Sequence, residues 1–365
     1  MKPIQTTNEA GFTRRSFLKV AGALGLSAAG MTLLEACGVQ PATSIPEGAP
    51  LETTTLHLIR TPSICIVPLY LAEEFLKMEG FTDVQYIDVP SGNSVGVMAA
   101  GQVDMAMQFS GPFITYVDAG EPIKVLAGVH VGCFVLFGND QVKTISDLKG
   151  KMVSIAALGG PEHAFISSIL TYVGLDPNTD INWTILPGPE AKQQFTDGKI
   201  DALLAFPPAA QELEDNKIGH MVLNSMTDAP WSQYYCCMVT GRSDFVQQNP
   251  VATKRALRAI LKATDICARD PERAAKFIVD NGFTQNYEYA LQAFRHIPYD
   301  VWRDFEPEDT IRFYALQLHE AGLIKSNPEG IIAKGTDWTF LNELKAELKA
   351  DNPLLPEHQH HSDHG

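Results

Sequence analysis

The apolar positions of this chain recur with two periods, one typical of strands and one typical of helices. Leu56 and Leu58 alternate with polar neighbours, whereas residues 67–78 form an apolar helical stretch ended by Gly80. The predicted strands span residues 54–59, 84–89, 152–157 and 234–240, and the predicted helices span 67–78, 162–173, 251–268, 271–281, 288–296, 307–321 and 336–349. Strands that alternate with helices up to about residue 240 predict an α/β architecture with mostly parallel sheets.

A glycine-rich loop, Gly159-Gly160-Pro161, joins one predicted strand to the helix that follows it. Glycine lets a backbone approach a ligand closely, and the first helical turn has N–H groups without intrahelical partners. A turn of this kind at the carboxyl edge of a sheet is where α/β folds bind ligands. An ordinary strand-to-helix turn has the same appearance, so this loop alone does not decide between the two.

The same arrangement occurs twice along the chain. Residues 101–107 (GQVDMAM) and 198–204 (GKIDALL) each combine a glycine turn, an aspartate and a short apolar strand. A loop with phenylalanine and proline follows each copy, and the copies lie 97 residues apart, about one α/β lobe. One copy alone is a common helix-to-strand turn, but the pair predicts two similar lobes.

Length, composition and charge restrict the possible functions. The chain has 365 residues, of which 45% are hydrophobic, enough to bury the cores of two lobes. Its formal net charge of −15 argues against nucleic acid and anionic membrane surfaces as partners.

The N-terminal residues predict export from the cytoplasm. Residues 13–19 (TRRSFLK) match a twin-arginine signal, and an apolar run over 20–34 is too short for a permanent membrane span. Residues 34–37 (LEAC) are typical of a lipobox, in which Cys37 is acylated, although Glu35 departs from its usual small residue. A plain cleaved signal is the alternative. Residues 38–53, rich in Pro, Gly, Ser and Thr, then predict a flexible tether.

The cysteines and histidines give no metal motif. Cys65, Cys133, Cys236, Cys237 and Cys267 lack zinc-ligand spacing, and their odd number does not imply a complete disulfide framework. We expect most of them to be small buried apolar residues. Residues 351–365 form a His-rich tail, which we expect to be disordered and which could bind Zn or Ni.

The order of motifs resembles the solute-binding proteins of ABC importers in the nitrate/sulfonate/taurine group, which includes binders of thiamine precursors and of flavins. The matching stretches are PLYLAE at 68–73, SGN at 91–93, AGQVD at 100–104, GEPIK at 120–124, DLKGKMV at 147–153, GL at 174–175, GKIDA at 198–202 and PP at 207–208. The resemblance covers residues 56–240 well. Residues 158–163 (LGGPEH) depart from it, because small hydroxyl residues are common there in the family.

The resemblance implies a type II periplasmic-binding-protein fold, with two lobes that close on a ligand by hinge bending. It implies a small-molecule solute, an ABC permease as partner, a monomer, an extracytoplasmic location, no cofactor and no catalysis. The expected organisation is a signal at 1–37, a tether at 38–53, lobe 1 at 54–142, lobe 2 at 143–232, a return to lobe 1 at 233–350 and the tail at 351–365. We also expect residues 241–243 (GRS) to be a crossover.

Because closure depends on contacts made only in the closed form, both lobes should supply ligand contacts. From lobe 1 we predict Thr61, Pro62, Ser63, Ser91, Gly92, Asn93, Phe109 and Ser110, and from lobe 2 Gly159, Gly160, His163, Phe206 and Pro207, with an aromatic wall from Tyr234 and Tyr235. Each phenylalanine could equally be a core residue, and Asn93 could equally be a helix cap.

The scarcity of basic residues near these positions favours a small polar organic solute with a ring or tail, such as a sulfonate, a pyrimidine or a flavin, over bare nitrate. Arg60 and Arg242 are the ready basic candidates. Two other classes remain open. A pyrimidine-forming enzyme has the same fold and a Cys-rich motif to which Cys236-Cys237 bears a faint likeness, although an export signal argues against that activity. Metal binding by the His-rich tail is the second.

Overall fold

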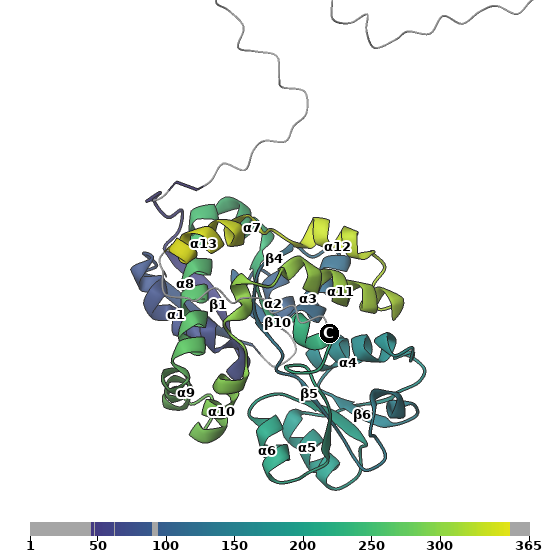
Figure 1. Ribbon diagram of the computed structural model, residues 1–365. Helices are drawn as coiled ribbons and strands as arrows, with labels where there is room; N and C mark the ends of the chain where they lie inside the picture. Colours follow the sequence, from purple (N-terminus) through teal and green to yellow (C-terminus); the bar gives the residue numbers. More distant parts are fainter. Residues whose placement is uncertain (1–44, 47, 62, 90–93, 351–365) are drawn as a thin grey trace, which may run out of the picture. The chain divides into compact units, whose positions relative to one another are not determined.

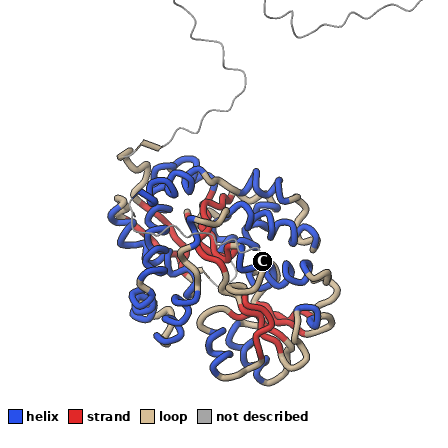
Figure 2. The backbone as a smooth tube through the Cα atoms, viewed as in Figure 1, coloured by secondary structure: helices blue, strands red, loops and turns tan. Residues whose placement is uncertain are grey.

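Two five-stranded sheets flanked by helices form the framework of the chain, as Figure 1 and Figure 2 show. The computed structural model describes residues 45–46, 48–61, 63–89 and 94–350. The predicted export signal with Cys37, part of the tether and the His-rich tail lie outside the described residues. Among the helices that are described, none is long and apolar enough to cross a membrane.

Lobe 1 is built on a sheet with the strand order β2-β1-β3-β10-β4. Its strands are β1 (Thr55–Arg60), β2 (Asp83–Asp88), β3 (Met105–Phe109), β4 (Ile123–Val131) and β10 (Tyr235–Arg242). β1 is parallel to β2 and β3, whereas β10 is antiparallel to β3 and β4. The helices that precede the second sheet along the chain are α1 (Val67–Met78), α2 (Ser94–Ala99) and α3 (Ser110–Asp118).

Lobe 2 repeats this plan with the strand order β7-β6-β8-β5-β9. Its strands are β5 (Val135–Gly138), β6 (Met152–Ile155), β7 (Asn182–Ile185), β8 (Ala202–Ala205) and β9 (His220–Asn224), and its helices are α4 (Pro161–Tyr172), α5 (Gly188–Thr196) and α6 (Ala209–Asp215). β6 is parallel to β7 and β8, and β5 is antiparallel to β8 and β9. The antiparallel strands, β10 in lobe 1 and β5 in lobe 2, are each the first strand after the chain has passed over from the other sheet.

The repeated Gly-x-x-Asp stretch has the same structural role in both lobes. The Asp104 carboxylate accepts the backbone N–H of His57 in β1 at 2.9 Å, and Asp201 accepts that of Met152 in β6 at 2.9 Å. β3 and β8, which follow these aspartates, occupy equivalent places in the two sheets. The repeat predicted from the sequence therefore corresponds to a repeat in the structure.

The chain crosses between the sheets twice, and the first crossing comes earlier than expected, whereas the expected boundary at 232/233 falls within the second. The first crossing lies between β4 and β5, at residues 132–134, whereas we expected lobe 1 to extend to residue 142. The second lies between β9 and β10, at residues 225–234. The predicted crossover at 241–243 is wrong, because Gly241 and Arg242 end β10 and Ser243 begins α7.

The C-terminal part is helical, as the periodicity predicts. Its helices are α7 (Ser243–Gln248), α8 (Pro250–Arg269), α9 (Pro271–Asp280), α10 (Tyr287–His296), α11 (Pro307–Glu320), α12 (Pro328–Gly335) and α13 (Thr339–Ala350). Short 3-10 turns lie at Ile64–Ile66, Ile145–Leu148, Trp231–Gln233 and Val301–Arg303. α8 packs against α1, and α11 contacts both α3 of lobe 1 and α4 of lobe 2. α11 is therefore a third link between the lobes.

Candidate functional site

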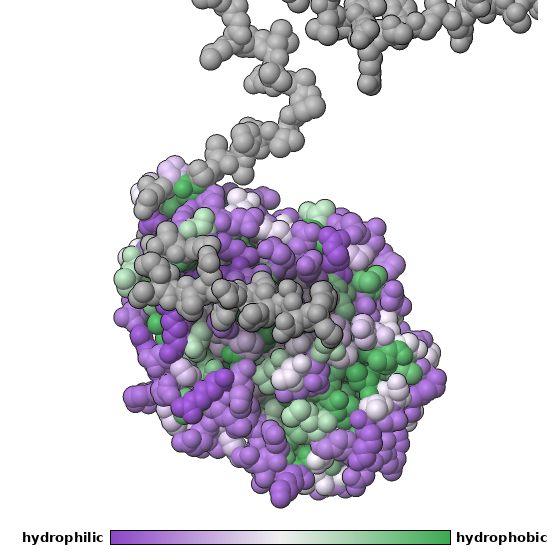
Figure 3. Space-filling model, viewed as in Figure 1, coloured by the Kyte–Doolittle hydropathy of each residue, from purple (hydrophilic) through white to green (hydrophobic). Residues whose placement is uncertain are grey.

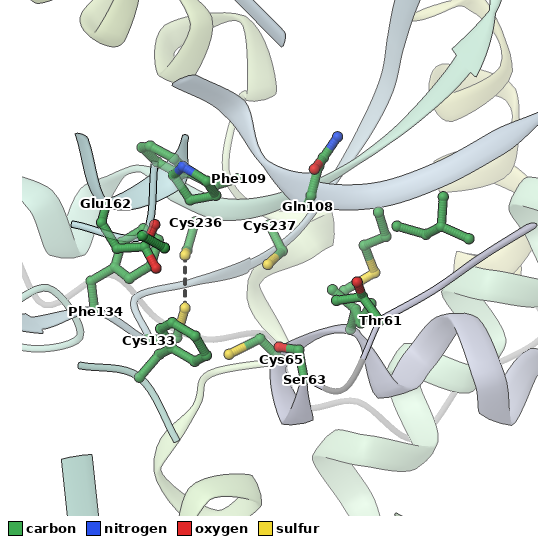
Figure 4. A pocket seen from close by; sticks show the side chains of 16 residues that line it. Thr61, Ser63, Cys65, Gln108, Phe109, Cys133, Phe134, Glu162, Cys236 and Cys237 are labelled. Carbon is green, nitrogen blue, oxygen red and sulfur yellow. Dashed lines mark hydrogen bonds between the residues drawn. The ribbon is translucent and has the colours of Figure 1, made fainter. Parts of the chain in front are cut away.

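A cavity of about 110 Å³ lies between the two sheets, where the parallel strands of both lobes end (Figure 4). It is lined by Ile59, Thr61, Ser63, Cys65, Ile66, Met107, Gln108, Phe109, Cys133, Phe134, Ala156, Pro161, Glu162, Phe206, Cys236 and Cys237. β1, β3, β6 and β8 each contribute their carboxyl-terminal edge or the loop after it. This is the position at which open α/β sheets bind ligands.

Four of the predicted contact residues line the cavity: Thr61, Ser63, Phe109 and Phe206. The Thr61 hydroxyl donates to the carbonyl of Val89 at 3.0 Å, which fixes the loop after β1. The Phe109 ring lies edge-on to Phe134 and Tyr314, with centroid distances of 5.1 and 5.0 Å. Phe109 is thus a packing residue as well as a cavity wall. Pro62, Ser91, Gly92 and Asn93 lie outside the described residues.

The loop before α4 approaches the cavity through different residues from those predicted. Pro161 and Glu162 line it, whereas Gly159, Gly160 and His163 do not. Gly159 has a φ of +73°, which favours glycine, while Gly160 has an ordinary φ of −74°. The Gly159 N–H donates to Nδ1 of His163 at 3.2 Å, and burial lowers the pKa of that imidazole. His163 therefore supports the loop.

The remaining predicted residues also lie off the cavity lining. Ser110 is fully buried as the first residue of α3, and Pro207 precedes α6. Tyr235 is a core residue of lobe 1, with its hydroxyl 3.1 Å from the carbonyls of Val301 and Phe305. Tyr234 stacks on Phe313 at 4.0 Å. The expected aromatic wall from these two tyrosines has no support, because both rings are occupied in packing elsewhere.

The scarcity of basic residues expected at the site extends to its two candidates, Arg60 and Arg242, which are both paired elsewhere. Arg60 is paired with Asp88 through bonds of 2.7 and 3.0 Å, so it is occupied outside the cavity. Arg242 is likewise bound to Asp104 and Asp244. The lining that the structure describes contains no Lys, Arg or His, and burial raises the pKa of Glu162. This lining is mainly apolar, with one acidic side chain and no basic one.

The site residues that sequence reasoning missed are mainly thiols. Cys65, Cys133, Cys236 and Cys237 all line the cavity, and the structure has them buried and free of disulfides. Burial confirms the expectation of buried cysteines, but their convergence was not expected. Cys133 lies in the first crossing and Cys236 two residues after the second. Proximity to a crossing is the sequence signal that could have identified them.

A fully buried histidine lies beside these thiols. Both ring nitrogens of His130 face carbonyl oxygens, Nε2 that of Cys65 at 3.1 Å and Nδ1 that of Val131 at 3.2 Å. Burial alone would lower the pKa of His130, but the neighbouring Cys237 and the carbonyls raise it to about 9. Hydrogen bonds from Cys133 and Cys236 lower the pKa of the Cys237 thiol well below its usual value. Cys237 therefore brings a thiol of lowered pKa to the cavity lining, with the His130 imidazole packed behind it and off the lining.

Comparisons with known proteins agree with this architecture. The model of the NMT1-like family matches residues 49–279. The nitrate/nitrite binding protein NrtA of Nostoc sp. is 25% identical in an alignment that covers 74% of this chain and 70% of that protein. A 4-amino-5-hydroxymethyl-2-methylpyrimidine phosphate synthase of Saccharomyces cerevisiae, THI13, is 24% identical over 70% of this chain and 81% of its own length.

Two solved structures share the fold at low sequence identity. The periplasmic nitrate-binding protein NrtA from Synechocystis PCC 6803 superimposes with a TM-score of 0.71 and 18% identity, over 83% of this chain and 91% of that one. The alkanesulfonate-binding protein SsuA from Xanthomonas axonopodis pv. citri superimposes with a TM-score of 0.66 and 16% sequence identity, over 79% of this chain and 100% of that one. The chain thus belongs to the NMT1-like family and has a periplasmic-binding-protein fold, as its sequence motifs implied.

Proposed function

We propose that this chain is the extracytoplasmic solute-binding protein of an ABC importer. The observation that carries the proposal is the cavity between two similar sheets, because each lobe supplies part of its lining. Ligand contacts made from both lobes favour the closed form, and closure is the signal that a permease reads. The names of the nitrate- and alkanesulfonate-binding relatives support this role.

The cavity chemistry favours a small, uncharged or cationic organic solute with a ring. Its volume of about 110 Å³ is close to that of an engineered cavity of about 150 Å³ that binds benzene. Phe109, Phe134 and Phe206 supply aromatic surface, and Thr61 and Ser63 supply hydroxyls. The Glu162 carboxyl disfavours a solute anion, since it occupies the first turn of α4 where an anion would otherwise bind. We therefore do not expect nitrate or an alkanesulfonate to be the preferred solute.

A thermal-shift screen, followed by calorimetric titration, tests this proposal. Nitrate, alkanesulfonates, pyrimidines, flavins, aromatic acids and aromatic amines form the panel. A true ligand at 100 times its Kd adds about 2.7 kcal/mol to the free energy of unfolding. Preferential stabilisation by nitrate or a sulfonate would contradict the assignment of solute class. No stabilisation by any small organic solute would contradict the binding role.

Phe206→Ala should then weaken binding of the ligand found in the screen, because it removes an aromatic wall from the lobe 2 side. Phe277→Ala in α9 is the matched control, since Phe277 is also partly buried but lies off the cavity lining. Both variants should lose some stability, and only the first should lose affinity. Equal affinities in the two variants would remove Phe206 from the site.

The proposal extends to location and partners. The twin-arginine signal and lipobox support export in the folded state and a lipid anchor at Cys37, with a monomer as the binding unit. The tether is shorter than the expected residues 38–53, because Leu51 packs against the core and the Glu52 carboxylate accepts the backbone N–H groups of Val251 and Ala252. Six of the eight large apolar residues exposed in the described part of the chain belong to lobe 2: Met152, Leu158, Tyr172, Val173, Ile185 and Met221. Figure 3 shows apolar side chains gathered on this lobe. This apolar face supports docking of lobe 2 on the permease.

A second candidate, an enzyme acting on a pyrimidine precursor, is favoured by the thiols in the cavity and by the yeast synthases among the relatives. Incubation of the protein with a ligand found in the screen separates the two functions. A binding protein returns the solute unchanged, and an enzyme converts it to a product of different mass.

A further inference from the structure

The three thiols of Cys133, Cys236 and Cys237 form one buried cluster. Their sulfur atoms all lie within 4.8 Å of one another, and each residue is 4% exposed or less. The sulfurs of Cys133 and Cys236 are 2.9 Å apart. Figure 4 shows that the sulfur of Cys65, which lines the same cavity, also points toward this cluster.

Packing does not explain why these side chains are gathered at this point. They come from two segments that are 103 residues apart in sequence, the first crossing and the start of β10 just after the second crossing. Cys133 has a φ of +146°, a backbone conformation that residues with a side chain rarely adopt. Backbone strain of this kind is typical of functional sites, where the surroundings hold a side chain in a required position.

The distances suit a metal ion bound by sulfur. With a Zn–S bond of about 2.3 Å, two sulfurs on one tetrahedral ion lie about 3.8 Å apart. Three sulfurs within 4.8 Å of one another reach this geometry through small side-chain movements. Thiolate sulfur is a soft ligand that favours Zn²⁺ and Cu⁺ over Mg²⁺ or Ca²⁺.

We propose that Cys133, Cys236 and Cys237 bind one thiophilic metal ion, Zn²⁺ or Cu⁺, at the floor of the cavity. The Cys65 sulfur is the fourth ligand available to a tetrahedral ion. His130 is not a ligand, because both its ring nitrogens face backbone carbonyls. The bound ion ties the first crossing to β10 of lobe 1.

Titration of the reduced full chain with Co²⁺ tests the site. Co²⁺ bound by thiolates gives an intense sulfur-to-metal charge-transfer band, which His residues of the tail do not produce. We expect one Co²⁺ per chain with this band, and its loss on displacement by Zn²⁺ or by Cu⁺. The ion that displaces Co²⁺ at the lower concentration identifies the preferred metal.

Cys133→Ala and Cys236→Ala should each lower the affinity at least 100-fold. Cys267→Ala is the matched control, since Cys267 is equally buried in α8 but outside the cluster. Native mass spectrometry of the unmutated chain gives a second measurement that needs no variant. There the mass should rise by one metal ion less the thiol protons that it displaces.

Absence of the charge-transfer band in the reduced chain would overturn the proposal. It would also be overturned if Cys267→Ala lowered the affinity as much as Cys133→Ala, or if the native mass showed metal bound without loss of protons. Retention of the band in Cys65→Ala at reduced affinity would support the three-thiol site with Cys65 as fourth ligand.

Discussion

The close contact between the two crossings gives a sharp test of how the lobes are joined. A Cβ atom added to Gly132, in the first crossing, would lie 2.5 Å from Cα and 2.8 Å from the backbone nitrogen of Met226 in the second. These are backbone atoms, so the contact is not relieved by rotating a side chain. Gly132→Ala should therefore force the two crossings apart.

The expected loss of stability has two parts. Gly132 has a φ of +62°, and placing alanine in this left-handed region costs about 1–2 kcal/mol. Overpacking against Met226 adds about 1–3 kcal/mol. Gly150→Ala is the matched control, because Gly150 has a φ of +74° and no atom within 4 Å of an added Cβ. The control should lose only the first part, about 1–2 kcal/mol.

Urea unfolding of both variants measures the two free energies, and calorimetric titration with a ligand found in the screen measures affinity. We expect Gly132→Ala to lose about 2–5 kcal/mol of stability in total and to bind more weakly, since the crossings set the relation of the lobes. Equal losses in the two variants would refute the reasoning, because they would mean that the contact with Met226 has no energetic effect.

Three further predictions concern single side chains. Tyr235→Phe removes the hydroxyl that lies 3.1 Å from the carbonyls of Val301 and Phe305 and should cost about 0.5–1.5 kcal/mol in urea unfolding, whereas unchanged stability would mean that this hydrogen bond adds nothing to the folded state. Because burial raises the pKa of folded Glu162, the wild type loses stability as the pH rises from about 4 through the folded pKa. Glu162→Gln removes this loss, so the free energy of unfolding of the variant should rise relative to that of the wild type from pH 4 to pH 7. A difference between the two that stays constant over this range would exclude the effect. Cys37→Ala should release the protein from membranes on fractionation, and continued membrane association would rule out the lipid anchor.

The local fold was predictable because its signals lie within short stretches. The helix over 67–78 was predicted at the boundaries that α1 has, and Gly101 and Gly198 marked the turns before β3 and β8. The first crossing was missed because the chain passes from β4 to β5 through an apolar stretch in which Gly132 is the single turn signal. Residues 109–112 were expected as a loop because of Pro112, whereas Ser110–Pro112 form the first turn of α3, where proline is tolerated.

The cavity was predictable in its general position and not in its chemistry. Strand ends such as Thr61 and Phe206 can be placed at a sheet edge from the sequence, whereas the partners of Cys133 depend on how the two crossings meet. Arg60 looked available because its partner Asp88 belongs to another strand, and Arg242 because Asp104, one of its two partners, is far away in sequence. Contacts between distant segments decide these cases, and periodicity carries no information about them.

The position of β10 determines the order in which the lobes can be completed during synthesis. β10 lies between β3 and β4, and β4 has no other strand partner in its sheet, so lobe 1 cannot close before residue 242 has left the ribosome. Lobe 2 is contiguous from β5 to β9, residues 135–224, and can finish first although it begins second. Until β10 has been synthesised, the nine-residue strand β4, which is rich in apolar residues, is an unpaired edge strand and prone to aggregation. The twin-arginine route proposed above accepts folded chains, and such a route would suit a protein whose first lobe is among the last parts to form.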